Sequence, residues 1–342
     1  MQITKELVTI LCPCYNAGKY IHQLLESILK QTYPSIEIII IDDGSSDDSK
    51  DVIERYIPSF FSRGYSLKYL YQKNQGQSVA IKNGLNIVNG EYLTWPDSDD
   101  FYSSNMAIEL MVKEFQSHPV SVGLVRSKGL YIKDQSNISP IGAIGENALP
   151  HIEKMQIFED CLFARNGFYF APIGYMTKTQ YLKNAIKNDI YTEKDAGQNW
   201  QLYLPLLYNY DCVTIPKYLH YVTVRTMSHS RGAYTGYFAI LKKLKAYENT
   251  LISTLQNIQN FNIKNQEYYI EKVRIKYAKE RLKLAFYNDD KNNLKTEYKY
   301  LKNINNLNRT NKLRYYISSI GLNKTYLHLE SLLKRLKKFI YD

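Results

Sequence analysis

Short apolar runs and stretches of helical spacing alternate through the first hundred residues of the chain. Apolar runs rich in β-branched residues predict buried strands, and apolar residues spaced by three and four predict helices. The expected strands are Val8–Cys12, Ile36–Ile41, Leu67–Tyr71 and Tyr92–Trp95, and the expected helices are Tyr20–Leu29, a helix capped by Ser46-Asp47-Asp48 that ends near Tyr56, and Gln77–Val88. This alternation predicts an α/β layer with a mostly parallel sheet.

Polar residues follow three of these expected strands. Asn16 comes after the first strand, Asp42 and Asp43 end the second, and Asp97 and Asp99 follow the fourth. Ligands of open parallel sheets bind outside the carboxyl ends of the strands. We therefore expect these side chains to gather at one edge of the sheet and to form a binding site.

Three carboxylates, Asp97, Asp99 and Asp100, stand together at the end of the fourth strand. Neighbouring carboxylates repel one another unless a cation or hydrogen-bond donors share them. A hard divalent ion such as Mg²⁺ is commonly held by one or two carboxylates together with phosphate oxygens. The alternative is a helix cap, in which Asp100 or Ser103 opens the next helix. The position at a strand end favours the binding site.

Two polar turns contain glycine. Asp42-Asp43-Gly44-Ser45-Ser46 places a carboxylate where it can accept a hydrogen bond from a base N–H, and Asn74-Gln75-Gly76-Gln77-Ser78 leads into a helix N-terminus, which favours anions. Each also fits an ordinary turn with a capping residue. The chain has no GxGxxG and no GxxxxGK segment, which argues against a dinucleotide oxidoreductase and an ATPase.

Taken together, these segments resemble the family 2 glycosyltransferases, which have the nucleotide-diphospho-sugar transferase (GT-A) fold. The matching text is TILCPCYNAGKYIHQLLESILKQTYPSIEIIIIDDGSSDDS, followed by QGQSVAIKNGLNIVNGEYLTWPDSDDFY. The family pattern has a Pro-x-Tyr-Asn strand end, a Leu-x-Ser-x-x-x-Gln-x-Tyr helix, a DDGS turn, an Asn/Gly-x-x-x-Ala-x-Asn-x-Gly helix and a DxD segment. Four of these motifs occur here in order, and the helix motif is matched at Gly76, Ala80 and Gly84, with Lys82 where the pattern has Asn. The resemblance implies a GT-A-like, Rossmann-type, mostly parallel sheet flanked by helices.

The resemblance also implies a site for the nucleotide. Asp43 would bind the uracil of a UDP-sugar donor, with Asn16 near the base. Pro13 and Tyr15, at the end of the first strand, would contribute to the same site. Lys82 would lie near the diphosphate.

The DxD segment would bind the rest of the donor. By resemblance, Asp97 would face the ribose and the metal, Ser98 would contact the donor, and Asp99 would ligate the Mn²⁺ or Mg²⁺ that bridges the two phosphates. An acceptor hydroxyl would then attack the anomeric carbon with the help of a base, and this single displacement inverts the anomeric configuration.

The expected position of the base differs from the family pattern. The family supplies its base from a Glu-Asp pair that opens a helix with text like EDxxLxLRL, whereas a helix expected over Gln198–Leu207 begins here with Gln198 and Asn199. An amide such as Asn199 does not take a proton at neutral pH, so Glu193 and Asp195 are the candidates. Asp195 also fits a capping box with Gln198, in which it would be the N-cap. The two roles do not exclude each other.

Arg225-Thr226-Met227-Ser228-His229-Ser230 resembles an Arg-x-x-Ser-His-Ser segment of wall-polymer members of the family. The resemblance implies that Arg225 and His229 contact the leaving diphosphate or complete the metal shell. The alternative is an ordinary surface loop, in which a single His has no functional role.

The charge of the chain is concentrated near its end. Residues 233–342 hold 22 of the 44 Lys and Arg but nine of the 33 Asp and Glu. Such a basic region suggests an anionic partner, and its last segment, Tyr326–Tyr341, has one apolar face with lysines beside it. This pattern fits a helix on an anionic membrane surface, and it also fits a packed helical subdomain or a contact within a homo-oligomer. No nucleic acid is expected, because no recognised motif accompanies the charge.

The compartment is inferred from what the sequence lacks. No run approaches the roughly 18 consecutive apolar residues of a membrane span, and the first residues do not have the pattern of a signal peptide. The four cysteines show neither metal-binding spacing nor a disulfide framework. We expect a cytoplasmic protein that attaches peripherally to the inner face of the plasma membrane.

The sequence therefore predicts a glycosyltransferase domain over residues 1–232 and a basic helical region over 233–342. Within the domain, residues 1–100 would bind the nucleotide-sugar and 101–232 the acceptor. The expected function is metal-dependent, inverting transfer of a hexosyl group from a UDP-sugar to a hydroxyl of a polysaccharide, wall-polymer or lipid-linked acceptor. Two alternatives are a non-catalytic nucleotide-sugar- or glycan-binding relative, suggested by Asn199, and a sugar nucleotidyltransferase, which should need a Gly-rich basic loop that Pro13–Gly18 lacks.

Overall fold

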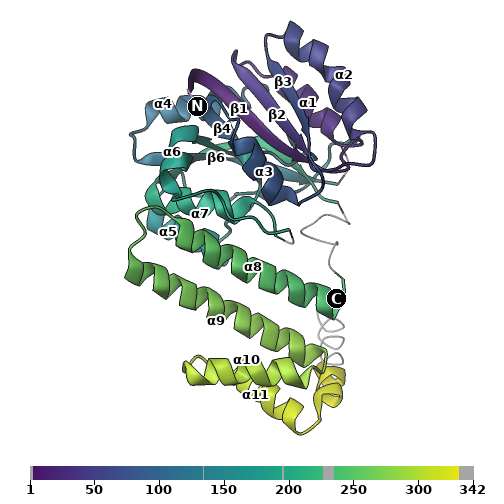
Figure 1. Cartoon of the computed structure of the whole chain (residues 1–342), viewed down its shortest axis with the longest axis vertical. Helices are drawn as coiled ribbons and strands as arrows, with labels where there is room; N and C mark the ends of the chain where they lie inside the picture. Colours follow the sequence, from purple (N-terminus) through teal and green to yellow (C-terminus); the bar gives the residue numbers. More distant parts are fainter. Residues whose placement is uncertain (1–2, 134, 195, 226–234, 331–342) are drawn as a thin grey trace. The chain divides into compact units, whose positions relative to one another are not determined.

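The structure is a computed structural model that describes residues 3–133, 135–194, 196–225 and 235–330 (Figure 1). The chain divides into two compact units. The first comprises Met1–Ala233 and Thr250–Asn262, and the second comprises Tyr234–Asn249 and Ile263–Asp342. The functional division into donor, acceptor and basic parts, at residues 100 and 232, stays a prediction.

Ten strands of the described residues form one sheet in the first unit, in the order β3-β2-β1-β4-β9-β6-β10-β5, with β7 beside β6 and β8 beside β10. They are β1 (Thr4–Cys14), β2 (Ile36–Asp42), β3 (Ser66–Tyr71), β4 (Gly90–Thr94), β5 (Phe101–Tyr102), β6 (Val122–Ile132), β7 (Pro140–Ile144), β8 (His151–Ile152), β9 (Tyr175–Lys178) and β10 (Asp211–Thr223). The first four strands are parallel, as predicted, and so are β6 and β10. The other pairs, including those that β9 makes with β4 and β6, are antiparallel.

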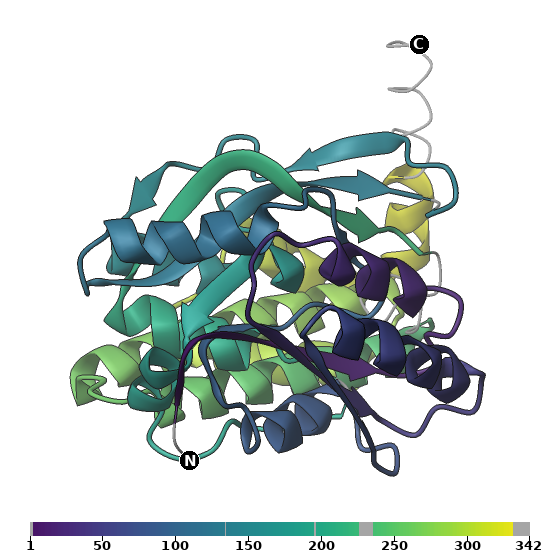
Figure 2. The ribbon, with the colours of Figure 1, turned by 90° about the horizontal axis from the view of Figure 1, so that it is seen from above.

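Helices cover both faces of this sheet (Figure 2). Those of the first unit are α1 (Ile21–Leu29), α2 (Ser49–Ser62), α3 (Gln77–Leu85), α4 (Ala107–Ser117), α5 (Lys154–Phe163), η1 (Pro172–Gly174), α6 (Thr179–Ala185) and α7 (Asn199–Asn209). Val8, Ile10 and Cys12 of β1 belong to a buried cluster with residues of α1, α2 and α4. Leu11 faces the other side, where its side chain contacts Gly84 of α3. The α/β fold class predicted from the alternation is confirmed.

Several expected boundaries are wrong; the helix expected over Gln77–Val88, for example, ends at Leu85. The second helix continues past Tyr56 to Ser62, with Pro58 inside it, because the fully buried Phe60 anchors its last turn in the core. The sequence pattern also predicts two separate strands at Val120–Val125 and Leu130–Lys133, whereas the structure has one continuous strand, β6. The polar residues between them remain in the sheet because their polar groups find partners there: Arg126 Nε donates to Thr214 Oγ1 of β10 at 3.0 Å.

The second unit is helical. It contains α9 (Ile263–Tyr287), α10 (Lys291–Asn303) and α11 (Arg309–Ser319), and the first part of α8 (Tyr237–Asn257) belongs to it as well. No helix in the described part of either unit is long and apolar enough to cross a bilayer. Most of the predicted terminal amphipathic segment, from residue 331 onward, lies outside the described residues.

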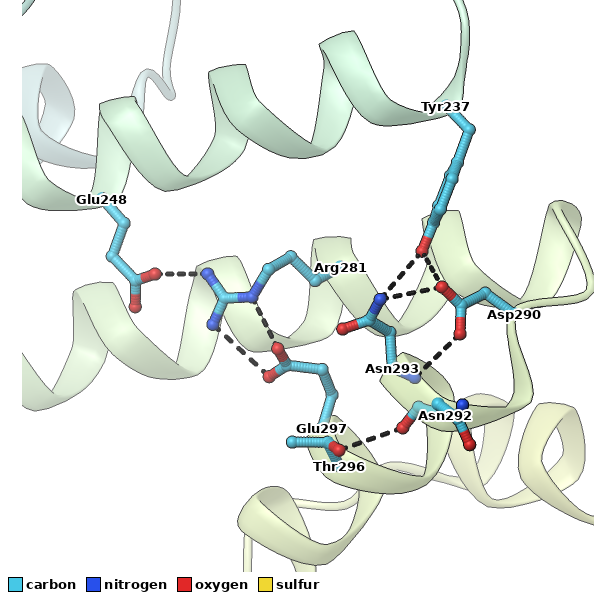
Figure 3. A network of polar contacts seen from close by, with 8 residues as sticks. All are labelled: Tyr237, Glu248, Arg281, Asp290, Asn292, Asn293, Thr296 and Glu297. Atoms are coloured by element: carbon cyan, nitrogen blue, oxygen red, sulfur yellow. Dashed lines mark hydrogen bonds and ion pairs between the residues drawn. The ribbon is translucent and has the colours of Figure 1, made fainter.

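Polar contacts connect the helices of the second unit (Figure 3). Arg281 of α9 pairs with Glu248 of α8 and with Glu297 of α10, where Nε lies 2.6 Å from Oε1. Tyr237 at the start of α8 donates to Asp290 Oδ2 at 2.6 Å, and Asp290 caps α10 by accepting from the backbone N–H of Asn293. Because the three side chains of the Arg281 cluster are only 12–14% exposed, this ion pair is shielded from solvent and fixes how the helices of this unit pack.

Candidate functional site

Asp43 directly follows β2, and its carboxylate fixes the loop before α3. Oδ1 accepts hydrogen bonds from Gln72 Nε2 at 2.7 Å and from the backbone N–H of Gln75 at 2.8 Å, and Oδ2 accepts from the backbone N–H of Gly76 at 2.8 Å. The side chain is buried. A carboxylate has about four acceptor positions, so these three bonds leave capacity for a ligand.

Two glycines allow close approach of backbone segments around this carboxylate. Gly44 has φ +82°, and a Cβ there would lie 2.8 Å from the backbone N of Asn74. Gly76 has φ +96°, and its Cβ would lie 3.1 Å from Cα of Lys194. Since L-residues rarely adopt such φ values, these positions require glycine. The loop before α3 therefore touches both the turn after β2 and the segment that precedes α7.

Asn16 connects the end of β1 to the same turn. Its backbone N–H donates to Ser45 Oγ at 2.9 Å, and its Oδ1 accepts from the backbone N–H of Ser46 at 2.8 Å. Pro13 is buried within β1, whereas Tyr15 is 53% exposed. The predicted nucleotide residues at the strand ends are thus brought together, and an exposed aromatic ring stands beside them.

Asp97 is held by two amides at the carboxyl end of β4. Its Oδ1 accepts from Gln77 Nε2 at 2.7 Å and from Gln198 Nε2 at 3.2 Å. Gln77 opens α3 and Gln198 is the N-cap of α7, so Asp97 joins the beginnings of both helices. Burial, together with the negative charge of Asp99, raises the pKa of Asp97 to about 6.

Asp99 and Asp100 are also buried, and Ser98 between Asp97 and Asp99 is only 8% exposed. Oδ2 of Asp99 lies 2.6 Å from Nε of Arg225, which pairs the two charges. Asp100 Oδ1 accepts from the backbone N–H of Thr223 at the end of β10. Desolvation raises the pKa of Asp99, and Arg225 opposes this rise. Desolvation and the two other carboxylates raise the pKa of Asp100 well above its usual range.

These charges fit a cation that is shared with an anionic ligand. Asp97, Asp99 and Asp100 face one described guanidinium, that of Arg225, so their mutual repulsion is only partly compensated. No group of three or more His, Cys, Asp or Glu within the described ranges could hold a metal by itself. One or two carboxylates plus phosphate oxygens and water is the ordinary way to hold Mg²⁺. His229, predicted as a further ligand, lies outside the described residues.

Other predicted residues lie further out. Lys82 Nζ pairs with Asp189 Oδ2 at 3.1 Å, and both side chains are more than one third exposed. Glu193 lies against the first turn of α3, where its backbone N–H donates to Ser78 Oγ at 3.0 Å and its carbonyl accepts from the same hydroxyl. Asp195 lies outside the described residues.

The start of α7 differs from the capping box expected from the sequence. The helix begins at Asn199, and Gln198 is its N-cap without a side-chain capping bond. Gln198 therefore does not occupy the third helical position that the capping box requires, and its side chain donates to Asp97 instead of the helix backbone.

Three glutamines of the site were not predicted: Gln72, Gln77 and Gln198. Gln77 had a local signal, since it stands directly after a glycine at a helix start. Gln198 had none, because 101 residues separate it from Asp97 in the chain.

Comparisons with known proteins concern the family and the fold of this chain. Residues 9–164 match the model of a family described as glycosyl transferase family 2. The glycosyltransferase GlyG of Streptococcus pneumoniae is 40% identical over 118 residues, which make up 34% of this chain and 38% of that protein. Chondroitin synthase of Escherichia coli is 33% identical over 132 residues, 39% of this chain and 18% of that protein. The matches span less than half the length of these relatives.

Solved structures share the fold. The structure of S. aureus TarS 1–349 in complex with UDP-GlcNAc matches with a TM-score of 0.63 at 17% identity. The match covers 96% of this chain and 92% of the TarS chain. The mannosyltransferase PcManGT from Pyrobaculum calidifontis, in complex with GDP-Man and Mn²⁺, has a TM-score of 0.53 at 14% identity and covers 95% and 88%. The fold and the acidic sheet edge define a protein of the GT-A class. The match to glycosyl transferase family 2 over residues 9–164 agrees with the motifs of the sequence.

Replacing Asp97 by Asn should stabilise the ligand-free protein at neutral pH. Because the folded protein binds the proton of Asp97 more tightly than the unfolded chain, ionisation above pH 6 costs stability, on the order of 1–3 kcal/mol. As the pH falls from 7 to 4, past the folded pKa of about 6 and toward the ordinary value of 3.8, this cost disappears in the wild type, whereas the variant has no such cost to lose. Urea unfolding at both pH values measures the effect, with the exposed Asp51→Asn as the control. Equal stability of Asp97→Asn and wild type at pH 7 would contradict the prediction.

Proposed function

We propose that this chain is a metal-dependent, inverting glycosyltransferase that moves a hexosyl group from a UDP-sugar to an acceptor hydroxyl. The observation that carries the proposal is the link between two acidic strand ends. Asp43 holds the backbone of Gly76, and the next residue, Gln77, donates to Asp97. The family match over residues 9–164 supports it, and TarS, which shares the fold, was crystallised with UDP-GlcNAc.

In this proposal the nucleotide lies beside Asp43. The remaining acceptor capacity of this carboxylate would bind the N–H of uracil, and Asn16 holds the adjoining turn in place. The exposed ring of Tyr15 offers an apolar face for the base. Lys82 would move from Asp189 to the diphosphate, an exchange with a small cost because an exposed ion pair contributes little.

Asp97 and Asp99 would hold the Mn²⁺ or Mg²⁺, with Ser98 beside the donor and His229 as a further ligand. When bound, the ion neutralises the charge that develops on the leaving diphosphate. Arg225 would add a second positive charge there, since its guanidinium already lies at Asp99. Within the fold class, PcManGT was crystallised with Mn²⁺.

The transfer needs a group that accepts a proton. The acceptor oxygen would bond to the anomeric carbon while the bond from that carbon to the diphosphate breaks, and the hydroxyl proton passes to a base. Asn199 cannot play this part. We assign the base to Asp195 and retain Glu193, which is fixed against α3 through Ser78, as the second candidate.

The proposed acceptor is a polysaccharide, a wall polymer or a lipid-linked glycan at an anionic membrane surface. In the second unit, Leu313, Tyr316 and Ile320 are 51%, 58% and 68% exposed and follow the spacing of one helical face. Exposed Lys312 and Lys324 accompany them. Apolar side chains beside lysines suit the surface of an anionic membrane. A second copy of the chain is the alternative partner of this face.

Asp99→Ala should remove the metal-dependent part of donor binding. In thermal-shift titrations, Mn²⁺ should strengthen UDP binding to the wild type. The increase in UDP affinity on adding Mn²⁺ should be at least about 10-fold smaller in the variant, because a carboxylate ligand is missing. Asp51→Ala serves as a control away from the site. Unchanged Mn²⁺ dependence in Asp99→Ala would contradict the metal assignment. A wild type that binds UDP but releases none from any UDP-sugar would support the non-catalytic alternative.

Asp195→Asn should lower kcat by at least about 100-fold while UDP binding stays unchanged, because general base catalysis contributes about 10²–10⁴-fold. The measurement is UDP release with acceptor present, compared with isothermal titration of UDP. Glu193→Gln is the matched variant. Loss of activity in that variant alone would transfer the role to Glu193, and full activity in both would exclude this segment as the source of the base.

Leu313→Glu combined with Ile320→Glu should reduce sedimentation with phosphatidylglycerol vesicles by several-fold, because the apolar contact is lost and two negative charges are added near an anionic surface. Ile263→Glu, at a similarly exposed position at the start of α9, is the matched control. Equal reduction in the control, or none in the double variant, would rule out this face as the membrane contact.

A further inference from the structure

Buried polar atoms without partners gather at the beginning of α7. Oε1 of Gln198, Oδ1 of Asn199 and Oε1 of Gln201 are buried and have no hydrogen-bond partner in the described part of the chain. The Gln198 and Gln201 residues are each 1% exposed. Buried side-chain polar atoms are nearly always hydrogen-bonded in native proteins. Three unpaired oxygens within four residues therefore indicate that a partner binds there.

The orientation of the two glutamine amides follows from the bonds they already make. Gln198 Nε2 donates to Asp97 Oδ1 at 3.2 Å, and Gln201 Nε2 donates to the carbonyl of Gly197 at 2.9 Å. Both acceptors are oxygens, so the amide nitrogens must face them and the amide oxygens remain. The missing partner must consequently be a hydrogen-bond donor.

The Gln198 end of this group lies beside the carboxylates assigned to the donor and metal. Gln198 contacts Asp97 directly. Gln201 is three residues further along and so shares its side of the helix. The group that satisfies them would thus sit next to the place where the diphosphate is proposed to bind.

Amides suit this position better than acids. The pKa of Asp97 is already raised by burial and by Asp99, and a glutamate at position 198 would add another negative charge against it. Gln198 instead donates to Asp97 and presents a neutral acceptor on its other atom. The unpaired amide oxygens therefore suit a hydrogen-bond donor.

The chemistry of the ligand narrows the choice. Phosphate oxygens of a diphosphate only accept hydrogen bonds, so they do not satisfy amide oxygens. Hydroxyls donate, and a nucleotide-sugar carries them on its ribose and on its transferred sugar. We propose that Gln198 and Gln201 form the subsite that receives the hydroxyls of the transferred sugar and selects which sugar is used. This inference rests on the proposed function.

Comparison of UDP with UDP-sugars tests the subsite, because UDP has the ribose but lacks the transferred sugar. Isothermal titration of the full chain with Mn²⁺ would use UDP, UDP-glucose, UDP-galactose and UDP-N-acetylglucosamine. The wild type should bind one of these sugars more tightly than UDP. Gln201→Met should leave the Kd of UDP within about two-fold of the wild-type value and raise the Kd of the preferred UDP-sugar by about 10-fold.

Gln180→Met is the matched control, since Gln180 is an exposed glutamine of α6 that bonds only to Asn184 in the described structure. Equal weakening of UDP and UDP-sugar in Gln201→Met would show a structural role and overturn the subsite. A panel in which no sugar binds better than UDP would overturn it as well, with the proposed function intact. A wild type that binds neither UDP nor any UDP-sugar would defeat the proposed function itself.

A second measurement avoids the risk that a core variant fails to fold. Monodeoxy analogues of the preferred UDP-sugar are titrated into the wild type. One of them should bind more weakly than the intact UDP-sugar, by about the same factor by which Gln201→Met weakens binding of the intact UDP-sugar. The Gln201→Met variant should bind that analogue about as weakly as the wild type does, because removing the hydroxyl and removing the amide break the same hydrogen bond. Additive losses for every analogue would overturn the assignment of Gln201.

Discussion

The hydrogen bonds that Asp43 accepts from the backbone of Gln75 and Gly76 set the position of the rest of the site. They join the end of β2 to the loop before α3, and Gln77, which opens α3, then reaches Asp97 at the end of β4. Bonds from backbone N–H groups to a buried carboxylate are strong and directional. Without them, the spacing between the two acidic strand ends would depend on a free loop.

The same edge of the sheet carries an electrostatic cost. Asp97, Asp99 and Asp100 are close together and shielded from water, and Arg225 is the one guanidinium paired with them in the described residues. Natural proteins accept such conflicts mainly at functional sites. In the proposed function a divalent ion with a diphosphate would relieve the repulsion, and this would account for three acids in a sequence that otherwise follows the rules of a buried core.

Local sequence patterns predicted the fold and the site correctly where neighbouring residues determine the structure. The apolar run after Leu7 forms β1, and the acidic residues at Asp43 and Asp97 lie at strand ends as expected. Contacts between distant segments were not predictable, because they depend on how strands and helices pack. Arg225 meets Asp99 only since β10 ends beside that turn, and Gln198 reaches Asp97 across 101 residues. The helix end at Ser62 was set by core packing of a single aromatic side chain.

The most direct test is a crystal structure of the full chain with UDP and Mn²⁺. We expect the uracil N–H at the Asp43 carboxylate and the ion between the phosphates and the carboxylates of Asp97 and Asp99. A nucleotide bound elsewhere, with Asp43 and Asp97 contacting no part of it, would contradict the central claim that the two linked strand ends form one donor site.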